Sequence, residues 1–207
     1  MEIISGGRGI EMKSSKFLLV STAAVFAMAL VASPRSAMAS SDVASQVGSS
    51  ISAKAQAPLM KFKILNQSAQ ETTYAVIFGA GDEVFSGLTQ FAEENHIVAA
   101  RITGIGAIQS ATLGWFDPRR KTYRRISIDH QSEVLSLLGD IAMYQGKPVV
   151  HAHMVVGFPD GTAHGGHLLQ AHVRPTLEVI VTAYPRPLYK KLDPEMGLAV
   201  IDPSVQK

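Results

Sequence analysis

The sequence predicts an α+β domain built mainly from an antiparallel β-sheet, with one principal amphipathic helix. Two observations support this fold class. A single segment has helical periodicity, and seven short β-rich runs follow it, separated by Gly, Pro, Asp or basic turns. The chain has 207 residues, which suits one medium-sized domain with a sizeable core. The sequence contains no internal repeat and no boundary of a second domain.

The N-terminal segment has the features of a secretory signal peptide. From Met12 the chain has two lysines, an apolar run over residues 17–32 and then Ala37-Met38-Ala39, the small-x-small pattern that signal peptidase cleaves. A transmembrane helix needs ~20 apolar residues, and this run is shorter. We therefore expect translation to start at Met12 and residues 1–39 to be removed. The protein is then exported, periplasmic or secreted, with no membrane span after cleavage.

Residues 40–58 are small and polar, which predicts a flexible leader before a single domain over residues 59–207. The domain begins with two strand-like runs, KFKILN at 61–66 and TTYAVIFG at 72–79. A helix follows them, and we expect Asp82 to be its N-cap. The apolar residues of this helix fall at i, i+4, i+7 and i+8, on one face: Val84, Leu88, Phe91 and Ala92.

The remaining predicted strands follow the helix, at residues 97–105, 107–117, 122–129, 133–143, 149–157, 165–173 and 176–184. The boundary between the first two predicted strands contains Gly104-Ile105-Gly106, which has the beginning of a dinucleotide-binding fingerprint. The third glycine position holds Gln109, however, and a strand rather than a helix follows. We therefore expect a turn between strands there. No G-x-S-x-G motif occurs, so a serine hydrolase is unsupported.

The charge balance argues against general nucleic-acid binding. The full chain has a formal net charge of +2, but residues 40–207 carry 15 basic and 15 acidic side chains, so the exported form is formally neutral. Sequence-independent binding to nucleic acid depends on basic charge that neutralises phosphates. The remaining basic cluster is one short patch, which we interpret as a solvated hairpin tip: Arg119, Arg120, Lys121, Arg124 and Arg125.

The chain contains no cysteine, which excludes disulfides, a thiol nucleophile and zinc–thiolate sites. Any bound metal must therefore be held by His, Asp or Glu. Histidine is concentrated in one stretch, because five of the seven histidines lie between Val149 and Val173. This stretch is the strongest candidate for a functional site.

The spacing of these histidines makes a geometric prediction. Residues two apart in an extended strand point to the same face, so His151 and His153 project together. A three-residue loop over residues 159–161, which contains Asp-Gly turn chemistry, pairs Phe158 with Thr162 and, counting back, His153 with His167. Three imidazoles then converge on one face of a hairpin.

Three convergent imidazoles match the His₃ arrangement of some catalytic zinc sites, in which a fourth position stays open to water. Neutral imidazole also suits iron, copper and nickel. The register is the deciding assumption. A two-residue loop would turn His167 to the opposite face, and a bulge at Gly165-Gly166 would re-aim His167 or recruit His164. Ordinary half-buried strand histidines, or a pH-responsive set, are the alternative interpretation.

Two carboxylates lie beside hydrophobic residues in predicted strands. Glu178 is in TLEVIVTAY and Glu133 opens EVLSLLG. Either can accept a hydrogen bond from a ligand histidine or act as a base on bound water, or can be a strand-edge charge that faces solvent. Glu178 is the stronger candidate, because its strand directly follows the histidine hairpin.

Four blocks occur in an order typical of a known family: GIGAIQSATLGWFD, SEVLSLLGDIA, GKPVVHAHMVVGFPDGTAHGGHL and RPTLEVIV. Residues 61–184 resemble the PPC domain (plants and prokaryotes conserved), and His-Ala-His and Gly-Gly-His-Leu are the most specific pieces. The resemblance implies an antiparallel α+β fold, assembly as a homotrimer and, in prokaryotic members, a metal site at His151, His153 and His167.

The resemblance also introduces a competing function. Prokaryotic relatives are often described as DNA-binding proteins and plant relatives carry AT-hook segments, but this chain has no Arg-Gly-Arg-Pro hook. Because a fold does not fix a function, three hypotheses stay open. The first is an exported homotrimer that binds a divalent metal, with zinc as the first choice. Such a protein could also be a metal-dependent enzyme that acts on an unknown small ligand. The second is a DNA-binding module that uses the basic cluster, and the third is a structural trimer whose histidines only pack.

Overall fold

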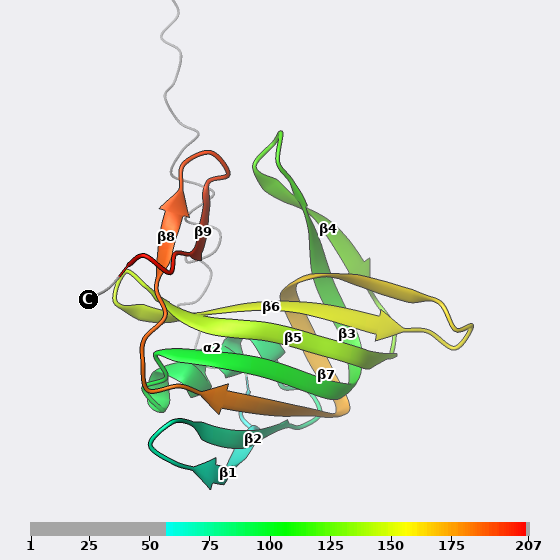
Figure 1. The fold of residues 1–207 in the computed structure, drawn as a ribbon. Coiled ribbons are helices and arrows are strands. Elements are labelled where there is room, and N and C mark those ends of the chain that lie inside the picture. The colour runs from blue at the N-terminus through cyan, green and yellow to red at the C-terminus, as the bar shows by residue number, and fades with distance from the viewer. Residues whose placement is uncertain (1–56, 206–207) are drawn as a thin grey trace, which may run out of the picture. The chain divides into compact units, whose positions relative to one another are not determined.

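The computed structural model describes residues 57–205, so the predicted signal peptide and nearly all of the predicted leader lie outside the described residues. Within this range the chain forms helix α2 (Val84–Glu94) and a series of strands (Figure 1). In chain order the strands are β1 (Lys61–Gln67), β2 (Thr72–Phe78), β3 (Ala99–Asp117), β4 (Thr122–Ile128), β5 (Ser132–Tyr144), β6 (Lys147–Gly157), β7 (Ala163–Ala183), β8 (Lys190–Asp193) and β9 (Leu198–Ile201).

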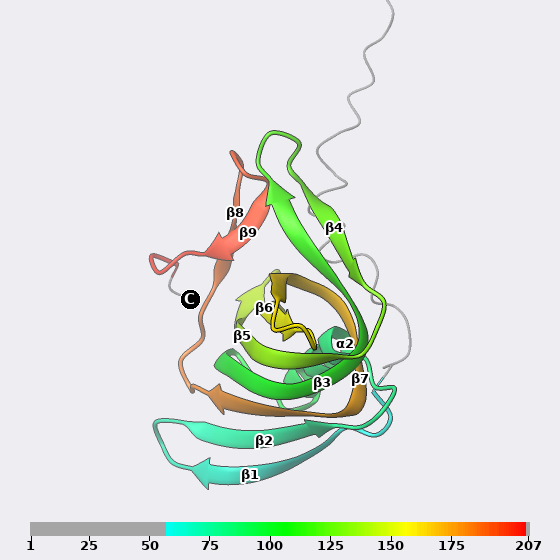
Figure 2. The ribbon, with the colours of Figure 1, turned by 90° about the vertical axis from the view of Figure 1, so that its right-hand side faces the viewer.

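Seven of these strands form one antiparallel sheet in the order β1-β2-β7-β6-β5-β3-β4. Strand β7 also pairs with β3 along most of its length, so the sheet curls and closes on itself through β3, β5, β6 and β7 (Figure 2). Strands β8 and β9 make a separate two-stranded hairpin. The predicted fold class, an α+β domain with a mainly antiparallel sheet and one principal helix, is confirmed.

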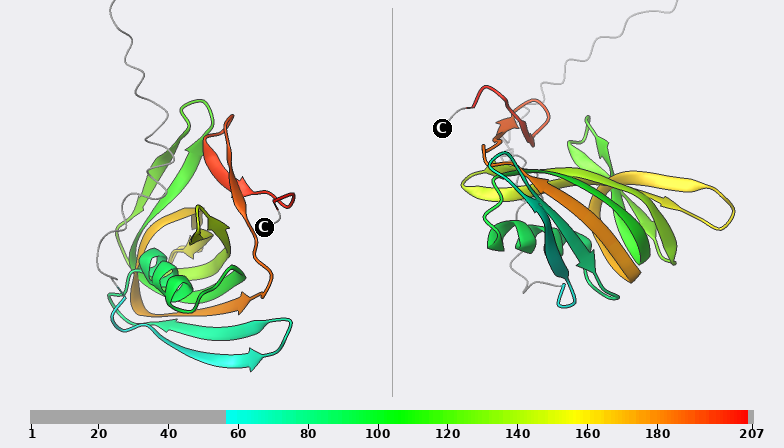
Figure 3. Two further views of the ribbon diagram at one scale, coloured as in Figure 1. Left: turned by 90° about the vertical axis from the view of Figure 1, so that its left-hand side faces the viewer. Right: turned by 60° about the horizontal axis from the view of Figure 1, so that its bottom comes forward.

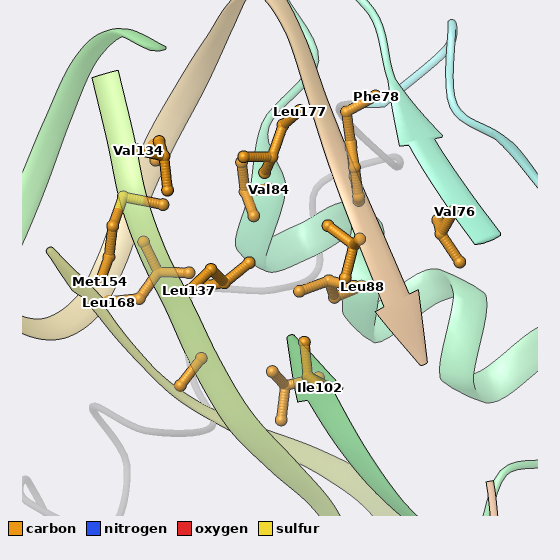
Figure 4. Packing of buried hydrophobic residues seen from close by; sticks show 14 of the residues in the cluster. Val76, Phe78, Val84, Leu88, Ile102, Val134, Leu137, Met154, Leu168 and Leu177 are labelled. Carbon is orange, nitrogen blue, oxygen red and sulfur yellow. The ribbon is translucent and has the colours of Figure 1, made fainter. Parts of the chain in front are cut away.

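The core lies between α2 and the inner face of the sheet (Figures 3 and 4). The four apolar residues that define the predicted helix face are fully buried, and burial stabilises a Leu or Phe side chain by about 1.5–3 kcal/mol. In β6 the buried residues alternate with exposed or half-buried ones, so Ala152 and Met154 face the core. This alternation leaves His151 and His153 on the outer face.

Helix α2 is capped by Glu83 rather than by Asp82, so the predicted N-cap is wrong by one residue. The Glu83 carboxylate accepts hydrogen bonds from the backbone N–H groups of Phe85 and Ser86 at 3.0 and 2.7 Å. Asp82 is buried, but its carboxylate accepts from the N–H groups of Leu59 and Gly79, both at 2.9 Å. It therefore closes the loop before the helix instead of capping it.

The expected turn at residues 104–106 is also wrong, because β3 runs through it as one strand. This segment is paired on both sides, with β5 and with β7. Gly106 has φ 151°, and a Cβ there would lie 2.4 Å from the Thr176 carbonyl oxygen. The glycines thus permit a close approach and a bulge inside a strand.

Strand β7 likewise joins two predicted runs, 165–173 and 176–184. Its register against β3 shifts between Val173 and Leu177, so Pro175 falls in an irregular part of the ladder, where a missing N–H is tolerated. The β8–β9 hairpin had no counterpart among the predicted strands.

In the part of the chain that the structure describes, no helix combines the length and the apolar character needed to cross a membrane.

Candidate metal centre

The β6–β7 hairpin brings the three predicted histidines together. The Phe158 N–H donates to the Thr162 carbonyl at 2.9 Å, which closes the three-residue loop, and His153 lies directly opposite His167. Pairing is regular through Gly165 and Gly166, which oppose Val155 and Met154. The bulge considered from the sequence is therefore absent from this described hairpin, and the register that places three imidazoles on one face is confirmed.

The three rings form a compact triangle. Ring centroids are 5.3 Å apart for His151 and His153, 5.2 Å for His151 and His167, and 5.3 Å for His153 and His167. One nitrogen from each ring can be chosen so that all three lie within 4.8 Å of one another. Ligand nitrogens around tetrahedral zinc are about 3.4 Å apart at bond lengths of ~2.0–2.1 Å, so the three rings would move closer together to hold an ion.

A carboxylate on the neighbouring strand holds one of the rings. Asp140 of β5 lies directly opposite His151 of β6, and its Oδ2 is 3.1 Å from His151 Nδ1. A carboxylate only accepts hydrogen bonds, so this contact places a proton on Nδ1 and leaves Nε2 with its lone pair. Metal-ligating histidines commonly have such a carboxylate partner.

Asp140 also forms an ion pair with Lys190 of β8, whose Nζ is 3.2 Å from Asp140 Oδ1. The Lys190 side chain is 4% exposed and that of Asp140 is 26% exposed. Burial by itself raises the pKa of the Asp140 carboxyl, but the hydrogen bond with His151 and the charge of Lys190 outweigh it, and the pKa lies below its ordinary value. Asp140 is therefore a carboxylate at neutral pH.

An aromatic ring stacks on one histidine of the cluster. Tyr123 of β4 stacks on His167 with ring centroids 4.7 Å apart and an interplanar angle of 21°. Gly114 of β3 lies opposite His167, and a Cβ at that position would come within 2.7 Å of the Tyr123 ring. The glycine therefore gives Tyr123 room to reach across β3, and burial raises the pKa of the Tyr123 hydroxyl.

Two of the three histidines have a lowered pKa, which favours the neutral ring that a metal ion needs. The pKa of His167 is lowered to about 4, mainly by burial and then by the charges of His151, His153 and Lys190. Burial lowers the pKa of His153 as well, followed by the effect of His151. The Nδ1 atom of His167 is buried and has no hydrogen-bond partner among the described residues. A buried polar atom without a partner is costly, and coordination to a cation would satisfy it.

The other sequence candidates lie elsewhere. Glu178 is exposed and lies opposite Ile105 of β3 and Ile77 of β2, and Glu133 is exposed too. The carboxylate that contacts the cluster is that of Asp140 instead. His164 is exposed, and its ring contacts Phe158. The basic cluster is exposed along the β3–β4 hairpin, where a solvated tip was expected.

Sequence reasoning missed three residues of the site: Asp140, Lys190 and Tyr123. Asp140 gave a usable signal, because it is a lone carboxylate within the apolar run from Val134 to Ala142. Lys190 and Tyr123 gave none, since they lie in polar stretches far from the histidines in sequence. Only the docking of their hairpins brings them to the cluster.

A curled antiparallel sheet with one covering helix and three histidines on its outer face defines the class of this protein. Residues 65–185, more than half of the chain, match the model of the Plants and Prokaryotes Conserved (PCC) domain. The chain belongs to this family. The match confirms the resemblance that the four sequence blocks indicate.

Solved structures similar to this chain come from bacteria and archaea. A presumed DNA-binding protein from Bacteroides thetaiotaomicron is 30% identical, with a TM-score of 0.63 over 68% of this chain and 96% of that one. A presumed DNA-binding protein from Ralstonia eutropha is 33% identical, with a TM-score of 0.61 over 68% and 95%. A metal-containing protein from Archaeoglobus fulgidus is 30% identical, with a TM-score of 0.59 over 69% and 97%. No curated protein matches the chain.

Proposed function

We propose that this chain is an exported, homotrimeric protein that binds a divalent metal ion, zinc, through His151, His153 and His167. The observation that carries the proposal is the convergence of three imidazoles, one of which has a buried nitrogen with no hydrogen-bond partner within residues 57–205. A carboxylate that orients His151 adds to it. The metal-containing relative from Archaeoglobus fulgidus supports the same conclusion.

The chain's own residues supply what a three-histidine centre needs. Asp140 keeps a proton on His151 Nδ1, and burial keeps His167 neutral at pH 7. Tyr123 stacks on His167, whereas His153 is exposed to solvent. A zinc ion held by these residues would supply Lewis acidity to a polar ligand.

Metal analysis of the protein, purified without a polyhistidine tag and loaded with zinc, tests the proposal. We expect one zinc ion for each three-histidine cluster in the wild type and none in the double variant His151→Ala/His153→Ala. His164→Ala is the matched control, because His164 lies in the same hairpin but outside the cluster. Equal metal content in all three proteins would overturn the proposal.

Self-association into a trimer is supported by apolar side chains on the outer face of the sheet. Ile105 is 62% exposed and Leu138 is 56% exposed, and Leu138 lies directly opposite His153. Contiguous exposed apolar groups are typical of interfaces. Light scattering of the purified protein is expected to give a mass of three chains, and a monomer at micromolar concentration would contradict this part of the proposal.

Export is supported by the charged segment, apolar run and cleavage pattern within residues 12–39. We expect cleavage after Ala39, so that the exported protein begins at Ser40. N-terminal sequencing of protein recovered from the periplasm or medium checks this. A chain that keeps residues 12–39 and remains in the cytoplasm would contradict it.

DNA binding is the second candidate, since two similar structures are described as presumed DNA-binding proteins and the β3–β4 hairpin carries exposed arginines. A trimer would present this hairpin three times. Binding to duplex DNA that falls steeply with salt, and that is lost in Arg124→Glu/Arg125→Glu, would favour this function. Absence of binding at low salt would exclude it.

A further inference from the structure

The β8–β9 hairpin lies C-terminal to the segment that matches the family model, and it reaches the three-histidine cluster. The family match ends at residue 185, and β8 begins at Lys190. The root of the hairpin is fixed to β5, because the Met143 N–H donates to the Leu188 carbonyl at 2.7 Å. Its turn is near the β3–β4 hairpin, where Lys121 Nζ is 3.4 Å from the Pro194 carbonyl. Figure 2 shows the two hairpins approaching each other on the side of the sheet away from α2.

Lys190 is the residue through which this hairpin acts on the site. Its side chain is buried, whereas the next residue, Lys191, is exposed. A buried ammonium group requires a partner of opposite charge, and the Asp140 carboxylate lies 3.2 Å away. The ion pair therefore adds to the contacts that hold the hairpin and the carboxylate in place.

The carboxylate of Asp140 is held at both oxygens. Oδ1 faces Lys190, and Oδ2 accepts the hydrogen bond from His151 Nδ1. Rotating the carboxylate would weaken both contacts, so Lys190 restrains the group that restrains the His151 ring. The contacts form a chain from the C-terminal hairpin through Asp140 to a ligand of the proposed metal.

We infer that Lys190 is a positioning residue of the metal centre. The C-terminal hairpin contributes to the site by supplying this residue. The inference rests on the proposed metal function. Partners that orient ligand histidines typically change metal affinity by about 10- to 100-fold, and Lys190 acts through such a partner.

The sign of the effect separates positioning from simple electrostatics. A lysine charge near a metal ion repels it, so removal of the charge alone would tighten metal binding. Removal of a positioning residue weakens metal binding, because His151 is no longer held in the ligating orientation. The two interpretations therefore predict opposite changes in zinc affinity for Lys190→Met.

The test compares Lys190→Met, Asp140→Asn, the double variant and the control Lys191→Met, which removes one exposed lysine charge from the same strand. Zinc affinity is measured by competition with a chelating dye. We expect Lys190→Met to bind zinc about 10- to 100-fold more weakly, the double variant to match Asp140→Asn alone, and Lys191→Met to match the wild type. Unchanged or tighter zinc binding by Lys190→Met would overturn the inference.

A second readout needs no metal. Nitrogen NMR of the metal-free wild type at pH 8 is expected to show His151 protonated at Nδ1, and Lys190→Met to show a mixture of tautomers. If Lys190→Met does not fold, Asp140→Ala, which removes the acceptor, provides this readout, and a wild-type tautomer in it would overturn the inference. If the wild type binds no zinc but the His151 tautomer still changes in Lys190→Met, the proposed metal function is rejected. The role of Lys190 in orienting His151 through Asp140 is then kept.

Discussion

Acidification of the metal-free protein is expected to destabilise it through His167. The folded protein holds this ring in neutral form, with a pKa of about 4, whereas in the unfolded chain the pKa has its ordinary value of 6.5. Between these values the unfolded chain binds more protons than the folded chain, so stability falls as the pH falls. The contribution of His167 is fully present above pH 6.5 and is lost by about pH 4.

The pKa difference sets the size of the loss. At 1.36 kcal/mol per pKa unit, a shift from 6.5 to about 4 corresponds to at most about 3 kcal/mol of unfolding free energy. By the same relation, about 2 kcal/mol is already lost at pH 5. This is a large share of the stability of an ordinary domain, which is about 5–15 kcal/mol.

The assay is urea unfolding of chelator-treated protein at pH 7.5 and pH 5, followed by far-ultraviolet circular dichroism. Protein concentration is held constant, because the apparent stability of an oligomer depends on it. His167→Gln is the control, since glutamine does not titrate and the other ionisable groups are unchanged. We expect the wild type to lose about 2 kcal/mol more than His167→Gln between the two pH values. Equal losses would refute the reasoning about His167.

Three further outcomes are expected. Asp140→Asn weakens zinc affinity by about 10- to 100-fold, measured by dye competition, and an unchanged affinity would contradict its role. Gly114→Ala lowers the unfolding free energy by about 1–3 kcal/mol in urea titrations, because its Cβ would lie 2.7 Å from the Tyr123 ring. An unchanged unfolding free energy would mean that the Tyr123 ring can move away from this position without cost. Zinc raises the melting temperature of the wild type, by binding only the folded state, but not that of His151→Ala/His153→Ala.

The alternation of side chains in β6 and the loop of the β6–β7 hairpin could be predicted because both are local. A period of two determines that His151 and His153 share a face, and the three-residue loop determines that His153 meets His167. Helix α2 was predictable for the same reason, from the spacing of its apolar residues. Its cap was not, because Asp82 and Glu83 are both suitable acceptors and only their contacts distinguish them.

Local turn signals failed inside the long strands β3 and β7. Gly104 to Gly106, and Arg174-Pro175, have the composition of turns. Gly104 to Gly106 pairs with β5 on one side and with β7 on the other, which keeps it extended, whereas Arg174-Pro175 lies at a shift in the register between β7 and β3. The cost of a bulge is smaller than the cost of leaving the ladder on both sides unpaired.

The sequence by itself determined the fold class, the helix face and the three histidines that share one surface, because each follows from the periodicity of a short segment. The tertiary structure alone decided which groups surround those histidines. Asp140, Lys190 and Tyr123 come from β5, β8 and β4 and reach the cluster through non-local strand pairing and the docking of two hairpins. Such contacts depend on the relative positions of distant segments, on which the spacing of residues within one segment carries no information.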